Sequence, residues 1–247
     1  DAVGGVLAHL ERRRVRRIGE EVARRLLVDL QRGERDRELH RARGVGGAAL
    51  VDGGGFFQVQ PDFGSSIVCA LARIGGESIG IIANQPSVIA GSIDVDAADK
   101  AAHFIQVCDS FHLPLVFLAD NPGVLAGQAS ERAGILRAGA RMFAAQTRAQ
   151  TVKVHVTLRK AYGFGSSVMA MNPYDEQTLS FGFPGATLGA MGASGAGNAV
   201  GADEATRAEL HQAENESSYR SANGLSFDDL IDPRDLRNVV IESLAVS

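Results

Sequence analysis

Residues 160–167 read Lys-Ala-Tyr-Gly-Phe-Gly-Ser-Ser, and they follow the β-like run Lys-Val-His-Val-Thr-Leu at residues 153–158. The turn leads into a stretch compatible with a helix, from Ser166 to Met171. A strand that ends in such a turn and opens a helix directs free backbone N–H groups and the positive helix end toward one point. Two interpretations stay open for the turn alone. It is either an oxyanion site made of backbone amides or a packing turn in which glycine permits close approach.

The segment before the turn repeats the same strand–loop–helix order. Leu113–Ala119 is a nearly all-apolar run typical of a buried parallel strand, a loop follows at Asp120–Gly127, and Ala133–Gln150 has a helical pattern. Two successive units predict right-handed crossovers and a parallel sheet, and ligands of such sheets bind beyond the carboxyl ends of the strands. The Asn121–Gly127 loop and the Gly163–Ser167 turn are therefore predicted to share one functional edge, which favours function over packing.

The other segments complete an α/β pattern. Gly75-Gly76 joins two β-like runs and is a hairpin signal. The predicted strands are Ile67–Ile74, Ser78–Ala83 and Leu179–Pro184, and the predicted helices are Ala97–His112, Ala202–Ser221 and Asp235–Leu244.

Residues 1–47 differ from the rest of the chain. They are rich in Arg, Glu and Leu, carry apolar residues at helical spacing, and end in three glycines at 44, 46 and 47. Acidic residues alternate with the arginine clusters, which is typical of a solvated helix face. We therefore predict two parts: an Arg/Glu-rich helical segment over 1–47 and a domain over 48–247.

Composition narrows the class of protein. The 247 residues carry a net charge of −4 and a pI near 5.9, which argue against a nucleic-acid partner. Cys69 and Cys108 lie in apolar runs and are read as free thiols in a reducing compartment. The six histidines lack zinc-ligand spacing, so no metal site is predicted. No apolar run has membrane-spanning length, so we expect no membrane partner and a cytoplasmic location.

Many ordered motifs carry a resemblance to a known family. The chain from about Ala48 to Leu244 resembles the biotin-dependent acyl-CoA carboxylases. Specifically, it is similar to the C-terminal half of the carboxyltransferase (beta) subunit of the acetyl-, propionyl- and methylcrotonyl-CoA enzymes. The matching motifs are Ile82-Ala83-Asn84-Gln85-Pro86, Ala90-Gly91-Ser92-Ile93-Asp94, Lys100–Ile105, Cys108–Phe111, Asn121-Pro122-Gly123, Gly134–Ala140, Arg159–Gly163, Ala190–Ala193 and Ile231–Arg234.

The resemblance implies a fold and a reaction. The fold would be crotonase-like, a spiral of ββα units with a mixed core sheet. In the family, carboxybiotin releases CO2 and leaves a biotin enolate, a ureido nitrogen takes the α proton of the acyl thioester, and the carbanion captures CO2. The half resembled here holds the biotin oxygen. The backbone amides of Phe164 and Gly165 would be its catalytic donors, and the implied cofactor-binding residues are Gly163, Phe164, Gly165, Asn121, Pro122 and Gly123.

The resemblance also implies several partners. The chain contains no Met-Lys-Met-type biotinylation site, so biotin would arrive on a separate biotin carboxyl carrier protein that works with a biotin carboxylase. The half of the family that binds the acyl-CoA is missing, so a CoA-binding N-terminal-half chain would be required. Apolar positions over Ile135–Gln146 further predict a helix buried against another subunit or half, and hence an oligomer.

Two departures from the family pattern keep alternatives open. The family commonly has Gly-Gly-Ala where this chain has Gly163-Phe164-Gly165, so the pocket shape must differ. Ser167 lies where several relatives carry an acid that influences acyl choice, so acyl length is not inferred. The leading prediction is an acyl-CoA carboxyltransferase component of the acetyl- or propionyl-CoA class. The alternatives are a biotin-dependent acyl-CoA decarboxylase and a non-catalytic assembly subunit.

Overall fold

The computed structural model describes residues 16–17, 20–21, 50–53, 56–172 and 179–246. The described strands form one mixed sheet of eight, in the order β1-β2-β3-β4-β5-β6-β8. The eighth strand, β7, pairs with the last residues of β5, beyond the part of β5 that pairs with β6. Their bounds are β1 Phe56–Val59, β2 Ile67–Ile74, β3 Glu77–Asn84, β4 Leu115–Asn121, β5 Lys153–Tyr162, β6 Leu179–Gly182, β7 Thr187–Gly189 and β8 Asp229–Leu230.

The hairpin and the parallel strands follow the sequence pattern. β2 and β3 pair antiparallel through the Gly75-Gly76 turn, whose two amides donate to the carboxylate of Asp52. β3, β4, β5 and β6 then run parallel, so their carboxyl ends share one edge. The α/β fold and the parallel core expected from the strand–loop–helix units are confirmed.

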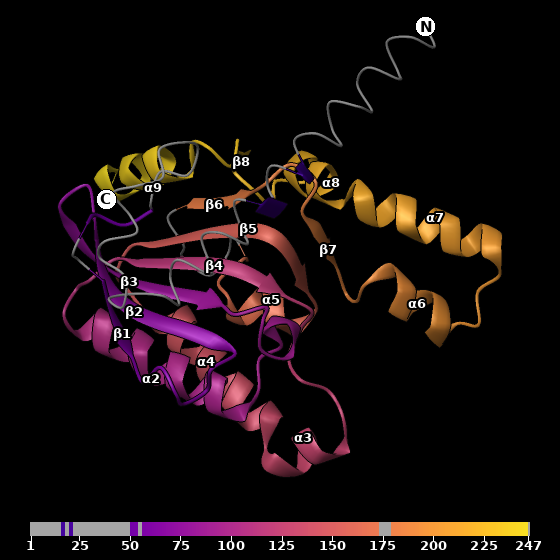
Figure 1. The fold of residues 1–247 in the computed structure, drawn as a ribbon, viewed down its shortest axis with the longest axis horizontal. Helices are drawn as coiled ribbons and strands as arrows, with labels where there is room; N and C mark the ends of the chain where they lie inside the picture. Colours follow the sequence, from indigo (N-terminus) through magenta and orange to yellow (C-terminus); the bar gives the residue numbers. More distant parts are fainter. Residues whose placement is uncertain (1–15, 18–19, 22–49, 54–55, 173–178, 247) are drawn as a thin grey trace, which may run out of the picture.

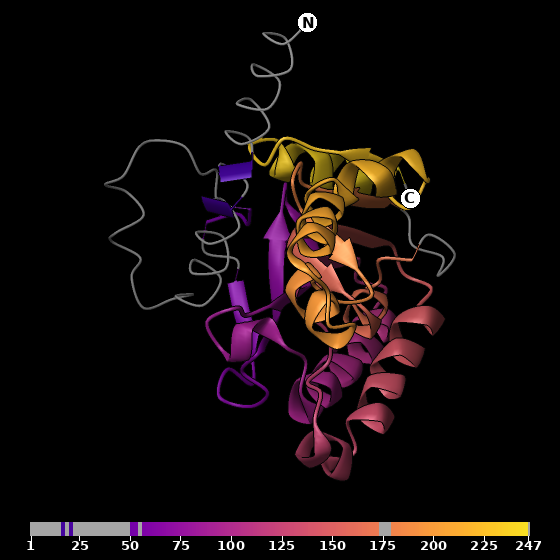
Figure 2. The same cartoon turned by 90° about the vertical axis from the view of Figure 1, so that its right-hand side faces the viewer.

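Helices cover both faces of this sheet (Figures 1 and 2). Their bounds are α2 Val95–Ser110, α3 Gln128–Ala133, α4 Ile135–Arg148, α5 Phe164–Val168, α6 Ala193–Ala199, α7 Glu204–Asn215, α8 Ser217–Asn223 and α9 Leu236–Ala245. α2 and α4 pack together on one face, over a core that includes Phe117 and Met142. α9 covers the other face, where Leu236 and Val240 join the strand side chains. α6 and α7 form a hairpin that projects beyond the sheet (Figure 1).

Two predicted helices differ in the structure. The stretch Ala133–Gln150 corresponds to α4, which begins at Ile135 because Gly134 takes a left-handed conformation (φ 94°) that separates it from α3, a short helix that the sequence did not predict. The stretch Ala202–Ser221 is α7 and α8, which meet at Glu216. After this break the hydroxyls of Ser217 and Ser218 accept hydrogen bonds from backbone amides at Leu188 and Gly185.

Two boundaries near the predicted site also differ. β5 extends to Tyr162 instead of ending at Leu158, because its last residues pair with β7. The helix predicted from Ser166 begins two residues earlier, at Phe164, which places both candidate donors in its first turn.

The segment predicted over residues 1–47 lies outside the described residues, apart from four helical positions at 16, 17, 20 and 21.

Within the described chain, α4 buries Ile135, Ala138 and Met142 against its own domain. The apolar pattern of this helix is therefore explained largely inside the chain, although Leu136 stays 70% exposed. None of the helices in the described ranges combines the length and the apolarity needed to cross a membrane.

Candidate functional site

The turn between β5 and α5 leaves two backbone amides without an acceptor among the described residues. Gly163 has φ 53° and ψ −138°, a conformation that glycine adopts without steric cost. Its own amide donates to the carbonyl of Gly189 (2.9 Å), and the amide of Ser166 donates to the carbonyl of Gly163 (3.1 Å). The amides of Phe164 and Gly165 lie between these two bonded groups, and neither donates to any acceptor among the described residues. They are the first two N–H groups of α5 and suit an incoming oxyanion.

Gly165 packs directly against the loop that follows β4. A Cβ built on Gly165 would lie 2.1 Å from Oδ1 of Asn121 and 2.6 Å from Cα of Gly123. The Asn121–Gly123 loop and the Gly163–Gly165 turn therefore lie side by side on one edge, as the sequence predicts. Asn121 and Gly123 therefore fill the space that a methyl group on residue 165 would need.

The side chain of Phe164 points away from the turn and packs on α4. Its ring centroid lies 5.8 Å from that of Phe143, and its Cε1 is 3.0 Å from the position that a Cβ of Gly139 would take. The absence of a side chain at Gly139 thus makes room for the ring. A phenylalanine is compatible with a backbone donor here because the ring and the N–H group have separate surroundings.

The predicted loop residues have unequal roles. Asn121 and Gly123 are buried, whereas Pro122 is exposed. Oδ1 of Asn121 accepts from the amide of Gly123 (3.0 Å). The carbonyl of Gly123 accepts from the amide of Ile93 (3.1 Å), which ties the loop to the chain before α2. The structure therefore brings five of the six predicted residues together as packed or hydrogen-bonding groups, with Pro122 at the surface beside them.

Sequence reasoning missed Asn84, the last residue of β3. Its Oδ1 accepts from the amide of Asp120 (3.0 Å) and from Nδ2 of Asn121 (3.0 Å), so it fixes the amide orientation of Asn121. Asn84 is fully buried, and its Nδ2 has no hydrogen-bond partner among the described residues. A polar residue at the end of a buried parallel strand was the available signal, because such ends line the functional edge.

His155 and Gln146 hold the opposite end of α5. Nδ1 of His155 lies 2.7 Å from the carbonyl of Met169 and therefore donates, and Nε2 then accepts from the hydroxyl of Thr157 (2.8 Å). Burial lowers the pKa of His155 to about 4, against the smaller opposing effect of the Met169 bond. Nε2 of Gln146 donates to the carbonyl of Ser167 (3.2 Å). The short helix is thus fixed at both ends.

An ion pair between buried Asp120 and partly exposed Arg159 lies next to the loop. Asp120 is 1% exposed, and its carboxylate is 3.1 Å from Nε of Arg159 on the adjacent strand. Burial raises the pKa of Asp120, and the charge of Arg159 acts in the opposite direction. The pair joins the ends of β4 and β5, so we assign it a role in holding these two strands in place.

A cavity of about 440 Å³ lies on another side of the turn. None of the six predicted site residues lines it. Its lining includes Ala161, Ser166, Met171, Leu188 and Gly189, with residues of the α7–α8 region opposite them. Among the described residues, no three acidic, histidine or cysteine side chains are grouped so as to hold a metal ion.

Comparison with known proteins identifies the family. The carboxyl transferase domain matches residues 47–247. The chain belongs to this family. It is 40% identical over 208 residues to the methylmalonyl-CoA carboxyltransferase 12S subunit of Propionibacterium freudenreichii, a match that covers 80% of this chain and 40% of that protein. It is 38% identical over 203 residues to the methylmalonyl-CoA decarboxylase subunit alpha of Veillonella parvula, covering 81% of this chain and 40% of that protein.

Solved structures agree on the fold. The transcarboxylase 12S hexamer with hydrolysed methylmalonyl-CoA has a TM-score of 0.74 at 40% identity, covering 80% of this carboxyl transferase chain and 38% of that one. The geranyl-CoA carboxylase beta subunit of P. aeruginosa has a TM-score of 0.73 at 29% identity, covering 81% and 40%. The expected crotonase-like fold is thereby confirmed. This chain spans about two fifths of the length of the curated relatives that it matches.

Proposed function

We propose that this chain is the biotin-binding half of an acyl-CoA carboxyltransferase. The observation that carries the proposal is the pair of backbone amides at Phe164 and Gly165, which have no acceptor among the described residues and lie beyond the carboxyl end of β5. Relatives named as carboxyltransferase, carboxylase and decarboxylase subunits that act on acyl-CoA support this proposal. We also propose a cytoplasmic enzyme, in keeping with the composition.

The donor set fits the ureido oxygen of biotin. Two adjacent N–H groups at a helix start suit a single oxygen on which negative charge develops, and they do so without a charged side chain. When bound, carboxybiotin would supply the carboxyl group. The amides of Phe164 and Gly165 would donate to the ureido oxygen, with Gly163 setting their direction and the Asn121–Gly123 loop forming the wall beside them. Removing one such donor costs about 3–4 kcal/mol of transition-state stabilisation in other enzymes.

A second half must complete the site. The relatives are about 2.5 times as long as the matched segment, so we propose that the acyl-CoA binds to a CoA-binding N-terminal half. A carrier domain with its biotin carboxylase would deliver the biotin. One solved relative is described as a hexamer in a multienzyme core, which supports an oligomer here. Relatives act on methylmalonyl- and propionyl-CoA, so this acyl class is the first to test.

A second candidate function is the reverse reaction, decarboxylation. Relatives named methylmalonyl-CoA decarboxylase subunit alpha match almost as well as the carboxyltransferase. The same amides would serve the reverse reaction, so decarboxylation is the second candidate function, and a non-catalytic assembly subunit is the third.

The deciding experiment is carboxyl transfer from carboxybiotin to propionyl- or acetyl-CoA, measured with and without the CoA-binding half. We expect product only when both halves are present. Decarboxylation of methylmalonyl-CoA in the same mixture would favour the second candidate. Correct assembly of both halves with no transfer in either direction would refute the enzymatic proposal and leave the assembly role.

A further inference from the structure

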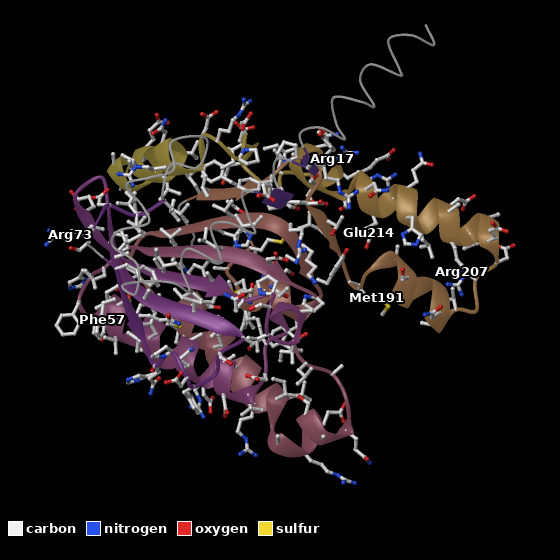
Figure 3. The ribbon with its side chains drawn as sticks, in the orientation of Figure 1. Arg17, Phe57, Arg73, Met191, Arg207 and Glu214 are labelled. Carbon is white, nitrogen blue, oxygen red and sulfur yellow. The ribbon has the colours of Figure 1, made fainter. Side chains whose placement is uncertain are left out.

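Glu214 of α7 joins three elements through one carboxylate. Its Oε1 accepts from the hydroxyl of Tyr162 (2.5 Å) and from the amide of Ala193 (2.9 Å). Its Oε2 lies 3.5 Å from Nδ1 of His211, one turn earlier on α7. Tyr162 is the last residue of β5, and Ala193 is the first residue of α6. Figure 3 shows Glu214 on the side of α7 that faces β7 and α6, near Met191.

The two hydrogen-bonding partners keep complementary protonation states. Burial and the bond with Glu214 raise the pKa of Tyr162 to about 12, so its hydroxyl stays a donor. Burial acts to raise the pKa of Glu214, but the hydrogen bonds from Tyr162, Ala193 and His211 outweigh this effect and lower it. The carboxylate is therefore ionised at neutral pH, and hydrogen bonds to an ionised acceptor are stronger than neutral ones.

This attachment leads directly to the proposed oxyanion turn. Tyr162 precedes Gly163, whose amide donates to the carbonyl of Gly189 (2.9 Å). The carbonyl of Ala190 lies 2.8 Å from the position that a Cβ of Gly163 would take, so residues 189–190 pack closely on the turn. The chain from Gly189 to Ala193 therefore touches the turn at one end and Glu214 at the other.

The α6–α7 hairpin buries few of its own residues. No residue of α7 is fully buried, and α6 buries only Ala193 and Gly197. Since little apolar surface fixes the hairpin, its placement against β5 and β7 depends strongly on polar bonds. Glu214 makes the most central of these, because its bonds reach both the end of β5 and the start of α6.

We propose that Glu214 is a positioning residue, which fixes Tyr162 and the start of α6 so that the Gly163–Gly165 turn keeps its amides aligned. This inference rests on the proposed carboxyltransferase function. Glu214 does not touch the reacting atoms itself. Its contribution is geometric, so a side chain with the same shape and acceptor oxygen fulfils it.

The test compares Glu214→Ala, Glu214→Gln and the control Glu209→Ala in the complete enzyme with both halves present. Glu209 is exposed on the same helix. We expect Glu214→Ala to lower kcat by about 10- to 100-fold, because small misplacements of catalytic groups cost that much. KM for the acyl-CoA should change less than about twofold, since only transition-state contacts are lost. Glu214→Gln should stay within about threefold of the parent, because its carbonyl oxygen accepts both hydrogen bonds.

Two further readouts separate positioning from general stability. Tyr162→Phe should lower kcat similarly, and adding it to Glu214→Ala should cost little more, because the two residues act through one bond. Hydrogen exchange followed by mass spectrometry should increase over residues 160–165 and 189–195 in Glu214→Ala, with the rest of the chain unchanged. Glu209→Ala should match the parent in both kinetics and exchange.

The outcomes decide the proposal. It is overturned if Glu214→Ala keeps parental kcat, if Glu214→Gln loses as much as Glu214→Ala, or if KM rises while kcat stays constant. An inactive parent enzyme would refute the proposed function instead. In that case, parental exchange rates over residues 160–165 in Glu214→Ala would overturn the positioning role by themselves.

Discussion

Replacing Gly165 by alanine tests how tightly the turn and the loop fit together. The added Cβ would lie 2.1 Å from Oδ1 of Asn121, more than 1 Å inside an ordinary carbon–oxygen contact. The loop cannot simply slide away, since Cα of Gly123 is only 2.6 Å from the same point. Displacing Asn121 would also strain its bonds with Gly123 and Asn84, which are both 3.0 Å long.

The expected cost follows from these contacts. Overpacking a tight site typically costs about 1–3 kcal/mol, and the two strained hydrogen bonds add about 2 kcal/mol, so we expect Gly165→Ala to lose about 3–5 kcal/mol. For a domain of this size that corresponds to a decrease in Tm of roughly 6–20 °C. Turnover should fall by about 10- to 100-fold because the amide is retained but displaced. Gly53→Ala is the matched control, since a Cβ there meets nothing within 4 Å.

The assays are thermal unfolding of the chain and carboxyl transfer with the CoA-binding half. Gly165→Pro adds the same Cβ and also removes the N–H donor, so its turnover should fall about 10²–10³-fold below that of the parent. Circular dichroism must show that both variants fold. A folded Gly165→Ala with parental Tm and turnover would refute the packing argument. A folded Gly165→Pro with parental turnover would refute the assignment of this amide as a donor.

Three other perturbations have definite expected results. The pKa of His155 is about 4 in the folded chain, against an ordinary value of 6.5. On acidification the unfolded chain therefore takes up this proton at a higher pH than the folded chain does. The free energy of unfolding should then fall by about 3 kcal/mol as the pH drops from 6.5 toward 4. Urea unfolding of His155→Asn should lack this pH dependence. Phe164→Ala loses its packing on Phe143 but keeps its amide, so kinetic assays should show altered biotin affinity and a smaller loss of turnover than in Gly165→Ala. Gly195→Ala in α6 should gain about 0.5–1 kcal/mol in thermal unfolding, because its Cβ meets only Sδ of Met191 at 4.0 Å.

The sequence predicted the elements that depend on local patterns. The Gly75-Gly76 hairpin, the apolar strand before Asn121 and the turn at Gly163 all carry their signal within a few residues, and the structure confirms each. The shared edge of loop and turn followed from the parallel order of the strands, which is a rule of topology and needs no side-chain detail. The short helix α3 and the left-handed Gly134 that ends it were missed, because a single glycine near the start of a helical pattern does not show on which side of it a helix begins.

The supporting residues could not be predicted in the same way. Asn84 and Asn121 are 37 residues apart, and Tyr162 and Glu214 are 52 residues apart. Their roles depend on which side-chain atoms meet after folding, and no periodicity encodes that. Glu214 in particular lies in a polar helix whose pattern indicates only a solvated face. The backbone framework of the site was therefore readable from sequence, whereas the side chains that hold it were not.

Four of the groups that support the turn keep the same charge over a wide pH range. Gly189 contributes a carbonyl, Asn121 a neutral amide, and His155 a neutral ring whose pKa is about 4. Tyr162 keeps its proton because its pKa is about 12. Across the pH range between these two values, none of these four groups changes charge. An oxyanion site made from backbone amides on such supports stays preorganised over that range. Under the proposed function, the pH dependence of carboxyl transfer is therefore expected to come from groups other than these four.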